Sequence, residues 1–345
     1  MGSNEKFDMS RPGSLLPAIR SDGSDVKTIA TNGEQKYGPH IVGHRTSDRE
    51  SMTIQDIECL VEARFGVGES PVWDGANNRL LWSDNTTDEV HAIDLASRAR
   101  RIWHFGDLIG SIGLTRSGRL IVALGNRVLL FDPVTEKQET LAEIAFREGV
   151  AKLNDGKVGP DGAFWVGSMA EREPNRRPVA SLYRVTADGT VEEKIAGGIK
   201  VSNGLAWSPD TRIMYHSDSR GGWIDAWDFN TATGAIANRR RLRQHAPEDG
   251  APDGGATDAA GVYWSAGFSA QCFNLIAPDG ALLAKLPVPA APTMPCFGGA
   301  DMKTLFFTSL TAHVTDEINE KYPLNGSVFM ARVDVAGTPV ALFAD

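Results

Sequence analysis

The 345-residue chain has little cysteine, no long apolar run and no excess of basic charge. Its three cysteines, Cys59, Cys272 and Cys296, lie far apart and form no CxxC pair, which argues against a disulfide framework and a thiolate zinc site. No segment approaches the ~20 consecutive apolar residues of a membrane helix, and residues 1–25 lack the apolar core of a secretory signal. We therefore expect a cytoplasmic protein without a membrane partner.

The charge balance also argues against nucleic acid as a partner. The formal net charge is -9, and binding to a phosphate backbone requires clustered Lys and Arg. Two basic clusters, residues 98–101 and 238–243, are short, and we interpret them as solvated strand edges. The expected partner is a small molecule, and the expected assembly is a monomer or a small homo-oligomer.

The first part of the chain differs in composition from the rest. Residues 1–52 are polar, rich in Ser, Gly, Asp and Arg, and have neither helical nor strand periodicity. This pattern predicts an N-terminal extension, either flexible or a docking arm. Residues 53–345 are predicted to form one folded domain.

Within that domain, six segments resemble one another and recur about every 40 to 50 residues. Each combines a short strand, a polar turn with Gly, Asp or Asn, and a second strand with aromatic and aliphatic residues; the segments begin at Ser70, Ser111, Asn154, Asn203, Asp253 and Cys296. Most are followed by two further strand-like runs. Four strands per unit predict an all-β fold, a six-bladed β-propeller. A WD40 array is a poor match, because both "WD" pairs lack the accompanying Gly-His.

The first strand of each propeller blade runs along the central channel, so residues at the start of these strands meet near the axis. By the repeat pattern these residues are Glu69, Ser111, Asn154, Asn203, Asp253 and Cys296. Carboxylate and amide oxygens suit a divalent cation that prefers oxygen ligands. The pattern therefore predicts a metal site made of Glu69, Asn154, Asn203 and Asp253. Ordinary turn formation is the alternative interpretation, because Asn and Asp favour turns.

Six motifs in this order resemble those of the gluconolactonase / senescence marker protein (regucalcin-like) family. They are "GESPVW" at Gly68, "LNDGKVGPDG" at Leu153, "GSMAE" at Gly167, "VSNGLAWSPD" at Val201, "PDGGATDAAGVYW" at Pro252 and "CFGG" at Cys296. The resemblance covers roughly residues 55–345. It implies a six-bladed propeller that hydrolyses sugar lactones to aldonic acids with one divalent cation. Ca²⁺ is the expected ion, and Zn²⁺, Mg²⁺ and Mn²⁺ are alternatives.

The resemblance also implies roles for individual residues. Glu69, Asn203 and Asp253 match the metal ligands of the family, and Asn154 matches a ligand in some members and a substrate contact in others. The metal would polarise the lactone carbonyl, and either Asp253 or a metal-bound water would act as the base. Asp253 is therefore also the expected catalytic residue.

Two positions depart from the animal relatives. Lys152 stands where those relatives have an arginine, and Arg172 stands where they have a second acidic residue. Both positions resemble substrate contacts, so the substrate-binding residues are expected to be Lys152, Asn154, Glu171 and Arg172. Two long loops, residues 170–180 and 311–326, are predicted to form a rim or lid over this face. The second includes a predicted turn of helix at "DEINEKY".

Two alternative functions remain open at this point. The same metal site would also suit another ester-like bond, such as that of a phosphotriester. A non-catalytic calcium-binding propeller would use the metal for structure alone. A serine hydrolase or zinc protease is not supported, because the chain has neither a Gly-x-Ser-x-Gly nor an HExxH motif.

Overall fold

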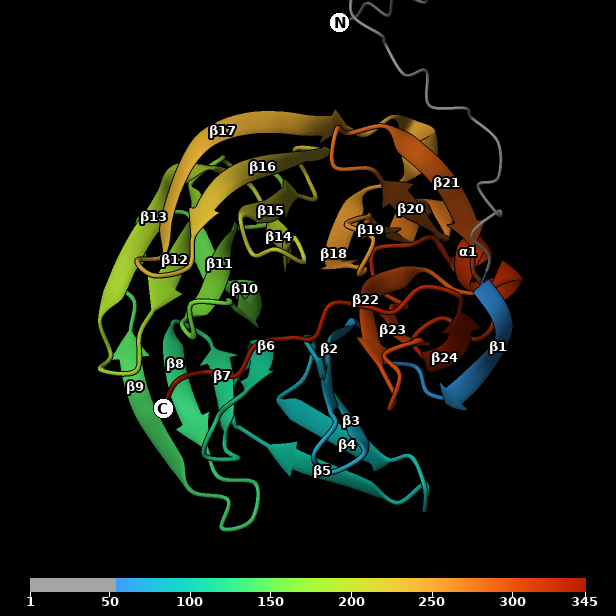
Figure 1. Ribbon diagram of the computed structural model, residues 1–345, viewed down its shortest axis with the longest axis horizontal. Coiled ribbons are helices and arrows are strands. Elements are labelled where there is room, and N and C mark those ends of the chain that lie inside the picture. Colours follow the sequence, from blue (N-terminus) through green and yellow to red (C-terminus); the bar gives the residue numbers. More distant parts are fainter. Residues whose placement is uncertain (1–53) are drawn as a thin grey trace, which may run out of the picture. The chain divides into compact units, whose positions relative to one another are not determined.

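Six four-stranded antiparallel sheets stand around a central axis in the computed structural model, which describes residues 54–345 (Figure 1). Each sheet is one blade, and its strands follow one another outward from the axis. The predicted six-bladed propeller is therefore confirmed. The predicted N-terminal extension, residues 1–52, lies outside the described residues.

The first three blades each consist of four consecutive strands. Blade 1 contains β2 (Gly68–Asp74), β3 (Arg79–Asp84), β4 (Glu89–Asp94) and β5 (Arg100–His104). Blade 2 contains β6 (Ile109–Leu114), β7 (Leu120–Leu124), β8 (Arg127–Phe131) and β9 (Gln138–Glu143). Blade 3 contains β10 (Val150–Val158), β11 (Phe164–Ala170), β12 (Ala180–Val185) and β13 (Val191–Ile199).

Blades 4 and 5 follow the same rule, whereas blade 6 is assembled from both ends of the domain. Blade 4 contains β14 (Ser202–Trp207), β15 (Ile213–Asp218), β16 (Trp223–Asn230) and β17 (Ala235–Gln244). Blade 5 contains β18 (Pro252–Thr257), β19 (Tyr263–Gly267), β20 (Cys272–Ile276) and β21 (Leu282–Pro287). Blade 6 contains β22 (Pro292–Gly298), β23 (Thr304–Ser309), β24 (Val328–Val333) and, as its outermost strand, β1 (Ile54–Val61).

The pairing of β1 with β24 closes the ring. The two strands are antiparallel, with Cys59 opposite Phe329. This arrangement links the first and last strands of the described domain, so opening the ring requires breaking a strand pair. The described residues also contain three short helices: η1 (Pro247–Asp249), η2 (Phe268–Ala270) and α1 (Asp316–Lys321), the last at the predicted position. None of the helices among residues 54–345 is long and apolar enough to cross a membrane.

Within a blade, the residues become less buried from the innermost strand to the outermost strand. Every residue of β14, the innermost strand of blade 4, is buried, whereas most residues of the outermost strand β17 are exposed. The basic run 238–243 lies on β17, as expected for a solvated strand edge. The second strands carry the large aromatic side chains that pack the blades together, and Trp82 and Trp165 are fully buried. The blades are thus held by apolar packing, which leaves polar residues free to face the channel.

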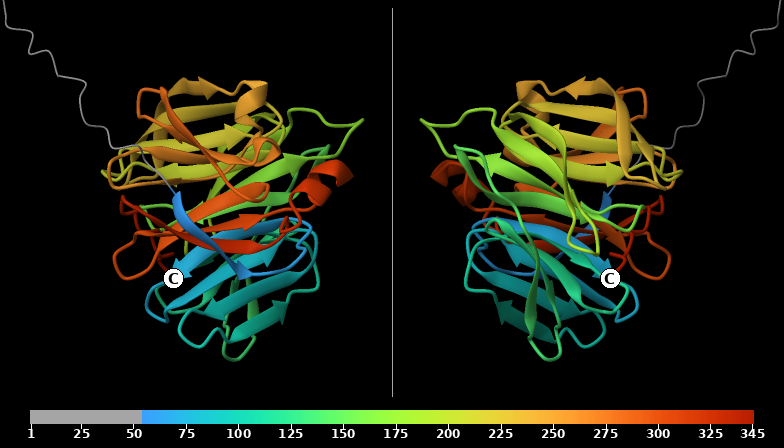
Figure 2. Two further views of the ribbon diagram at one scale, coloured as in Figure 1. Left: turned by 90° about the vertical axis from the view of Figure 1, so that its right-hand side faces the viewer. Right: turned by 90° about the vertical axis from the view of Figure 1, so that its left-hand side faces the viewer.

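The last residues of the chain cross the end of the channel. After β24 the chain runs from blade 6 over the axis toward blade 2 (Figure 1). On the way the Thr338 amide donates to the Thr257 carbonyl at 2.9 Å, and the Phe343 amide donates to the Leu114 carbonyl at 2.9 Å. Figure 2 shows the C-terminus toward one face of the ring and α1 projecting from the other. One end of the channel is therefore covered by the chain's own C-terminal segment.

Candidate functional site

The innermost strands of four blades carry the four predicted ligands, and each strand is irregular at that residue. The register is shifted between Glu69 and Val72 in β2, Leu153 and Gly156 in β10, Asn203 and Ala206 in β14, and Pro252 and Gly255 in β18. A β-bulge bends its strand and changes the direction of the side chains beside it. These bulges explain how polar side chains at the start of buried strands are aimed toward the axis.

Backbone conformation at two positions supports this arrangement. Gly204, directly after Asn203, has a φ of 67°, and a Cβ there would lie 2.5 Å from the hydroxyl oxygens of Ser217 and Tyr263. Only glycine fits both the conformation and the space. Ser70, directly after Glu69, has a φ of 48°, and its amide donates to Glu69 Oε2 at 2.9 Å. Strained backbone of this kind is concentrated at functional sites.

A single cavity collects the predicted ligands. Glu69, Asn154, Asn203 and Asp253 all line it, together with Lys152 and Arg172. The inner strands begin at this end of the channel, opposite the end that the C-terminal segment covers. Glu171 is exposed and is not among the lining residues. The structure therefore brings together all of the predicted site residues except Glu171.

The two carboxylates of the cavity are buried, and neither forms an ion pair within residues 54–345. Burial and, after it, the charge of Asp253 raise the pKa of Glu69 well above its usual value. Burial and then the charge of Asp155 raise the pKa of Asp253 in the same direction. The Asp253 carboxylate accepts no hydrogen bond from any other residue of 54–345. Two buried carboxylates in this state are costly, and a divalent cation between them would remove the cost.

The two amides add neutral oxygen donors. Asn154 Nδ2 donates to the Ser202 carbonyl at 2.9 Å, and Asn203 Nδ2 donates to the Ser219 hydroxyl at 2.7 Å. Both amide oxygens are thereby left for another partner, and that of Asn203 is buried with no partner within the described part of the chain. Among residues 54–345 no group of three or more His, Cys, Asp and Glu side chains is arranged to hold a metal ion without other ligands. The donor set is therefore half carboxylate and half amide, and it fits a cation that prefers oxygen.

Lys152 forms part of the cavity wall. Its ammonium group donates to the Asn85 carbonyl at 3.2 Å and to the Ile109 carbonyl at 3.0 Å. Burial lowers the pKa of this group to about 8. An ammonium group has three N–H donors, so one remains for a ligand in the cavity.

Several lining residues were not singled out by the sequence pattern: Arg176, Ser219, Arg220 and His313. Arg176 stands on the loop of residues 170–180 and His313 on the loop of residues 311–326, so both predicted rim loops contribute to the cavity. The length of these loops was the available signal. Arg220 lies on the short connection between β15 and β16, which carries no such signal because its motif, "DSRGG", is typical of any turn.

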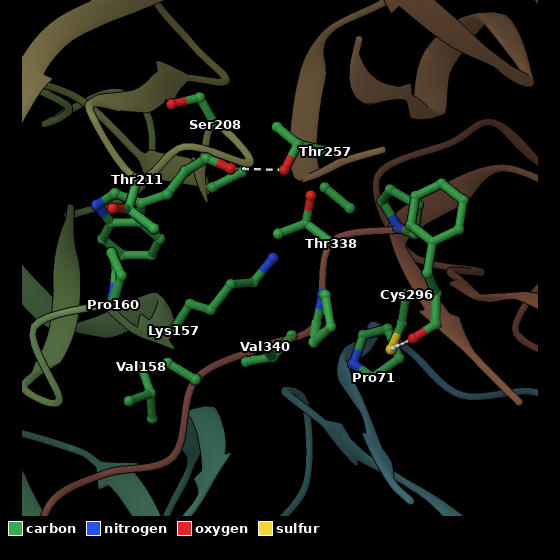
Figure 3. A pocket seen from close by; sticks show the side chains of 17 residues that line it. Pro71, Lys157, Val158, Pro160, Ser208, Thr211, Thr257, Cys296, Thr338 and Val340 are labelled. Atoms are coloured by element: carbon green, nitrogen blue, oxygen red, sulfur yellow. Dashed lines mark hydrogen bonds between the residues drawn. The ribbon is translucent and has the colours of Figure 1, made fainter. Parts of the chain in front are cut away.

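The expected position of Cys296 is wrong. Strand β22 begins at Pro292, and near this end the Thr293 hydroxyl donates to the Gly68 carbonyl at 2.5 Å. Cys296 comes later in the strand and lines a second cavity, with Lys157, at the end that the C-terminal segment covers (Figure 3). The "CFGG" motif was aligned with the start of the repeat, although it lies toward the end of its strand.

Comparison with known proteins gives a consistent result. The family model described as "SMP-30/Gluconolactonase/LRE-like region" matches residues 67–311. A protein named 6-deoxy-6-sulfogluconolactonase, from Pseudomonas putida, is 35% identical over 292 residues, which cover 84% of this chain and 99% of that protein. Regucalcin of Gallus gallus is 32% identical over 300 residues, which cover 85% of this chain and 100% of that protein.

Solved structures show the same likeness in three dimensions. A calcium-binding protein, regucalcin, from Agrobacterium tumefaciens has a TM-score of 0.78 and 25% identity, covering 84% of this chain and 98% of that one. A luciferin-regenerating enzyme has a TM-score of 0.75 and 28% identity, covering 85% of this chain and 100% of that one. These relatives match the propeller over nearly their whole length.

Proposed function

The chain belongs to the SMP-30/gluconolactonase/LRE-like family, and on this basis we propose that it is a metal-dependent lactonase that hydrolyses sugar lactones to aldonic acids. The observation that supports this most directly is the meeting of four oxygen donors from four blades in one cavity. The proposed ligands of the cation are Glu69, Asn154, Asn203 and Asp253. Relatives with lactonase names over most of the chain support the reaction class.

The donor set suits Ca²⁺, which accepts carboxylate and amide oxygens in flexible geometry. The two carboxylates balance the charge of the cation, and the two amides add oxygens without adding charge. When bound, such a cation polarises the lactone carbonyl and stabilises the negative charge that develops on its oxygen. The cavity beside the four donors leaves room for the substrate, which distinguishes it from a closed structural site.

Asp253 is proposed as the general base. Its carboxylate has no hydrogen-bond donor among residues 54–345, so an oxygen that does not hold the cation can accept a proton from water. The water oxygen then bonds to the carbonyl carbon, and the bond between that carbon and the ring oxygen breaks. The proton passes from Asp253 to the departing ring oxygen, which leaves a hydroxyl group and the aldonic acid.

Lys152 is proposed to orient the substrate. Two of its N–H groups are held by backbone carbonyls, which fixes the ammonium group at the cavity wall. The third is then directed at a sugar hydroxyl without a large loss of side-chain freedom. Asn154, on the same strand, lies beside it and faces the same cavity.

Chelation and resupply of single ions test the proposal. Protein freed of metal is given Ca²⁺, Mg²⁺, Mn²⁺ or Zn²⁺ in turn, and hydrolysis of a lactone panel and of a phosphotriester is followed by acid release. The expected result is lactone hydrolysis that depends on the cation and is lost in Asp253→Asn and Glu69→Gln. Calorimetry with Ca²⁺ provides a reading that does not depend on activity.

Asp74→Asn is the matched control, because Asp74 is 6% exposed and Asp253 is 7% exposed. Asp74 lies at the opposite end of the strand that carries Glu69, so its variant is expected to keep cation binding and activity. Hydrolysis that survives complete chelation would contradict the metal mechanism. No hydrolysis of any lactone by protein that binds the cation would contradict the lactonase, and turnover of the phosphotriester alone would replace it with that alternative.

A further inference from the structure

The cavity contains more positive side chains than carboxylates. Lys152, Arg172, Arg176 and Arg220 line it, against Glu69 and Asp253. The whole chain is acidic, with 44 Asp and Glu against 35 Lys and Arg. The excess of positive side chains in the cavity therefore does not follow from the composition of the chain. If the two carboxylates hold a divalent cation, none of the positive side chains has a free carboxylate partner in the cavity.

The arginines of this group are poorly paired within the protein. The guanidinium groups of Arg172 and Arg220 make no hydrogen bond and no ion pair with any other residue of 54–345. Arg176 donates from Nε to the Glu171 carbonyl at 3.2 Å and lies 3.7 Å from a carboxylate oxygen of Glu173. By contrast, Arg184 on blade 3 is held 2.7 Å from its carboxylate partner.

The three arginines also lie near one another, although Arg220 stands on a different loop from Arg172 and Arg176. Burial and, after it, the charges of Arg172, Arg220 and Arg176 lower the pKa of His313. Burial and next the charge of Arg220 lower the pKa of Arg176. Like charges that are gathered in this way with little pairing repel one another, and an anionic ligand would relieve the repulsion.

We propose that Arg172, Arg176 and Arg220 form an anion subsite at the mouth of the cavity, and that the preferred lactone carries a phosphate, sulfonate or carboxylate group. The arginines stand on loops at the rim, whereas the cation ligands stand on the inner strands. The anionic group therefore lies at the end of the sugar that is remote from the lactone carbonyl. Guanidinium groups bind such oxyanions through paired hydrogen bonds. This inference rests on the proposed lactonase function for the identity of the substrate as a lactone.

Binding of stable sugars tests the subsite without any chemistry. Calorimetry on the Ca²⁺-loaded protein compares glucose with glucose 6-phosphate, 6-deoxy-6-sulfoglucose and glucuronate at constant ionic strength. At least one anionic sugar is expected to bind about tenfold or more tightly than glucose. Arg172→Gln and Arg220→Gln are each expected to lower the affinity for that anionic sugar by about tenfold and so to reduce its preference over glucose. The three anions identify which group the subsite prefers.

Arg177→Gln is the matched control. Arg177 stands on the same loop as Arg172 and Arg176, but it pairs with Glu148 at 3.3 Å and does not line the cavity. Its variant is expected to bind every sugar as the unmodified protein does. Equal affinity for glucose and all three anionic sugars would overturn the proposal. So would equal losses in Arg177→Gln and Arg172→Gln, because they would indicate a general effect of surface charge.

Hydrolysis of neutral glucono-1,5-lactone and its 6-phosphate, measured in parallel, separates this inference from the proposed function. Faster turnover of the 6-phosphate that is lost in Arg172→Gln supports both. If no lactone is hydrolysed but the arginines still select an anionic sugar, the lactonase proposal fails and the anion subsite stands. If the neutral lactone is hydrolysed and no anionic sugar binds more tightly, the lactonase stands and the subsite is overturned.

Discussion

The Ser219 hydroxyl accepts a 2.7 Å hydrogen bond from the side-chain amide of Asn203, and the amide oxygen of Asn203 is left buried without a partner. This bond determines which end of the amide faces the cavity. It ties a residue on the inner strand β14 to one just beyond β15 of the same blade. Ser219 is thus a positioning residue for a proposed ligand of the cation.

Removing this bond should weaken cation binding. In Ser219→Ala the Asn203 amide loses its partner and can rotate, so the affinity for Ca²⁺ is expected to fall by about tenfold or more, as for other residues that orient metal ligands. Calorimetric titration measures the change. Ser208→Ala is the control, because Ser208 and Ser219 are both 8% exposed and Ser208 lines the opposite cavity. Unchanged affinity in Ser219→Ala would show that the bond does not position the ligand.

Gly204→Ala should impair both stability and cation binding. A Cβ at Gly204 would meet the hydroxyl oxygens of Ser217 and Tyr263 at 2.5 Å, in addition to the strain of a φ of 67°. Gly106→Ala separates the two effects, because Gly106 has a φ of 75° and no atom within 4 Å of the added Cβ. We expect backbone strain of about 1–2 kcal/mol in both variants. A further loss of stability in urea, together with weaker Ca²⁺ binding, is expected in Gly204→Ala alone.

The repeated pattern of the sequence was sufficient to predict the blades and to place the four proposed oxygen donors at one cavity. Strand pairs and polar turns recur with enough regularity to place Asn203 and Asp253 at the start of inner strands. The closing role of β1 could not be predicted in this way, because strand pairing between the two ends of a domain leaves no local signal. The position of Cys296 was missed for a related reason: a motif identifies a strand but not the point along it that reaches the cavity.

The residues at the rim of the cavity were harder to predict than the proposed ligands of the cation. The proposed ligands stand on strands whose register the fold determines, whereas Arg220 and His313 stand on connections. Connections follow no hydrophobic period, and the direction of their side chains depends on contacts with neighbouring blades. Arg172 and Glu171 illustrate the limit. They are adjacent in the sequence and were both predicted to contact substrate, but only Arg172 lines the cavity.

This difference leads to a prediction for the two substrate-contact candidates Lys152 and Glu171. Lys152→Met is expected to raise KM for the lactone and to lower the free energy of unfolding by about 1–3 kcal/mol, because the carbonyls of Asn85 and Ile109 lose their donor. Glu171→Gln is expected to leave KM within about twofold, because Glu171 is exposed and outside the cavity. Steady-state kinetics on both variants measures KM. A large rise in KM for Glu171→Gln would show that its loop moves into the cavity when substrate binds.

Stability in acid should depend on Asp249, just before the strand that carries Asp253. Burial raises the pKa of Asp249, but hydrogen bonds from Lys285 and Arg243 outweigh it and lower the pKa to about 2. Both partners lie 2.7 Å from its oxygens. The pKa is about 3.9 in an unfolded chain, so the charged form stabilises the folded state above about pH 4, and this stability is lost as the pH falls toward 2.

The free energy of unfolding of Asp249→Asn should therefore be lower than that of the unmodified protein at pH 5. This difference in free energy should shrink as the pH falls to 2. Urea unfolding at each pH measures it. Glu248→Gln is the control, because Glu248 is exposed, adjacent and without an ion pair within residues 54–345. The free energy of unfolding of Glu248→Gln is expected to stay close to that of the unmodified protein at every pH. A difference for Asp249→Asn that does not vary with pH would contradict the role of the charged carboxylate.

The C-terminal segment should contribute to stability mainly through Phe343. This side chain is fully buried in the cluster that joins blades 2 and 3, whereas its neighbour Leu342 is 43% exposed. Phe343→Ala leaves a cavity between two blades and is expected to lower the free energy of unfolding by about 3–5 kcal/mol. Leu342→Ala removes a side chain of similar character at the adjacent position and is expected to change it by less than about 1 kcal/mol. Urea unfolding monitored by tryptophan fluorescence measures both, and equal effects would show that Phe343 does not join the blades.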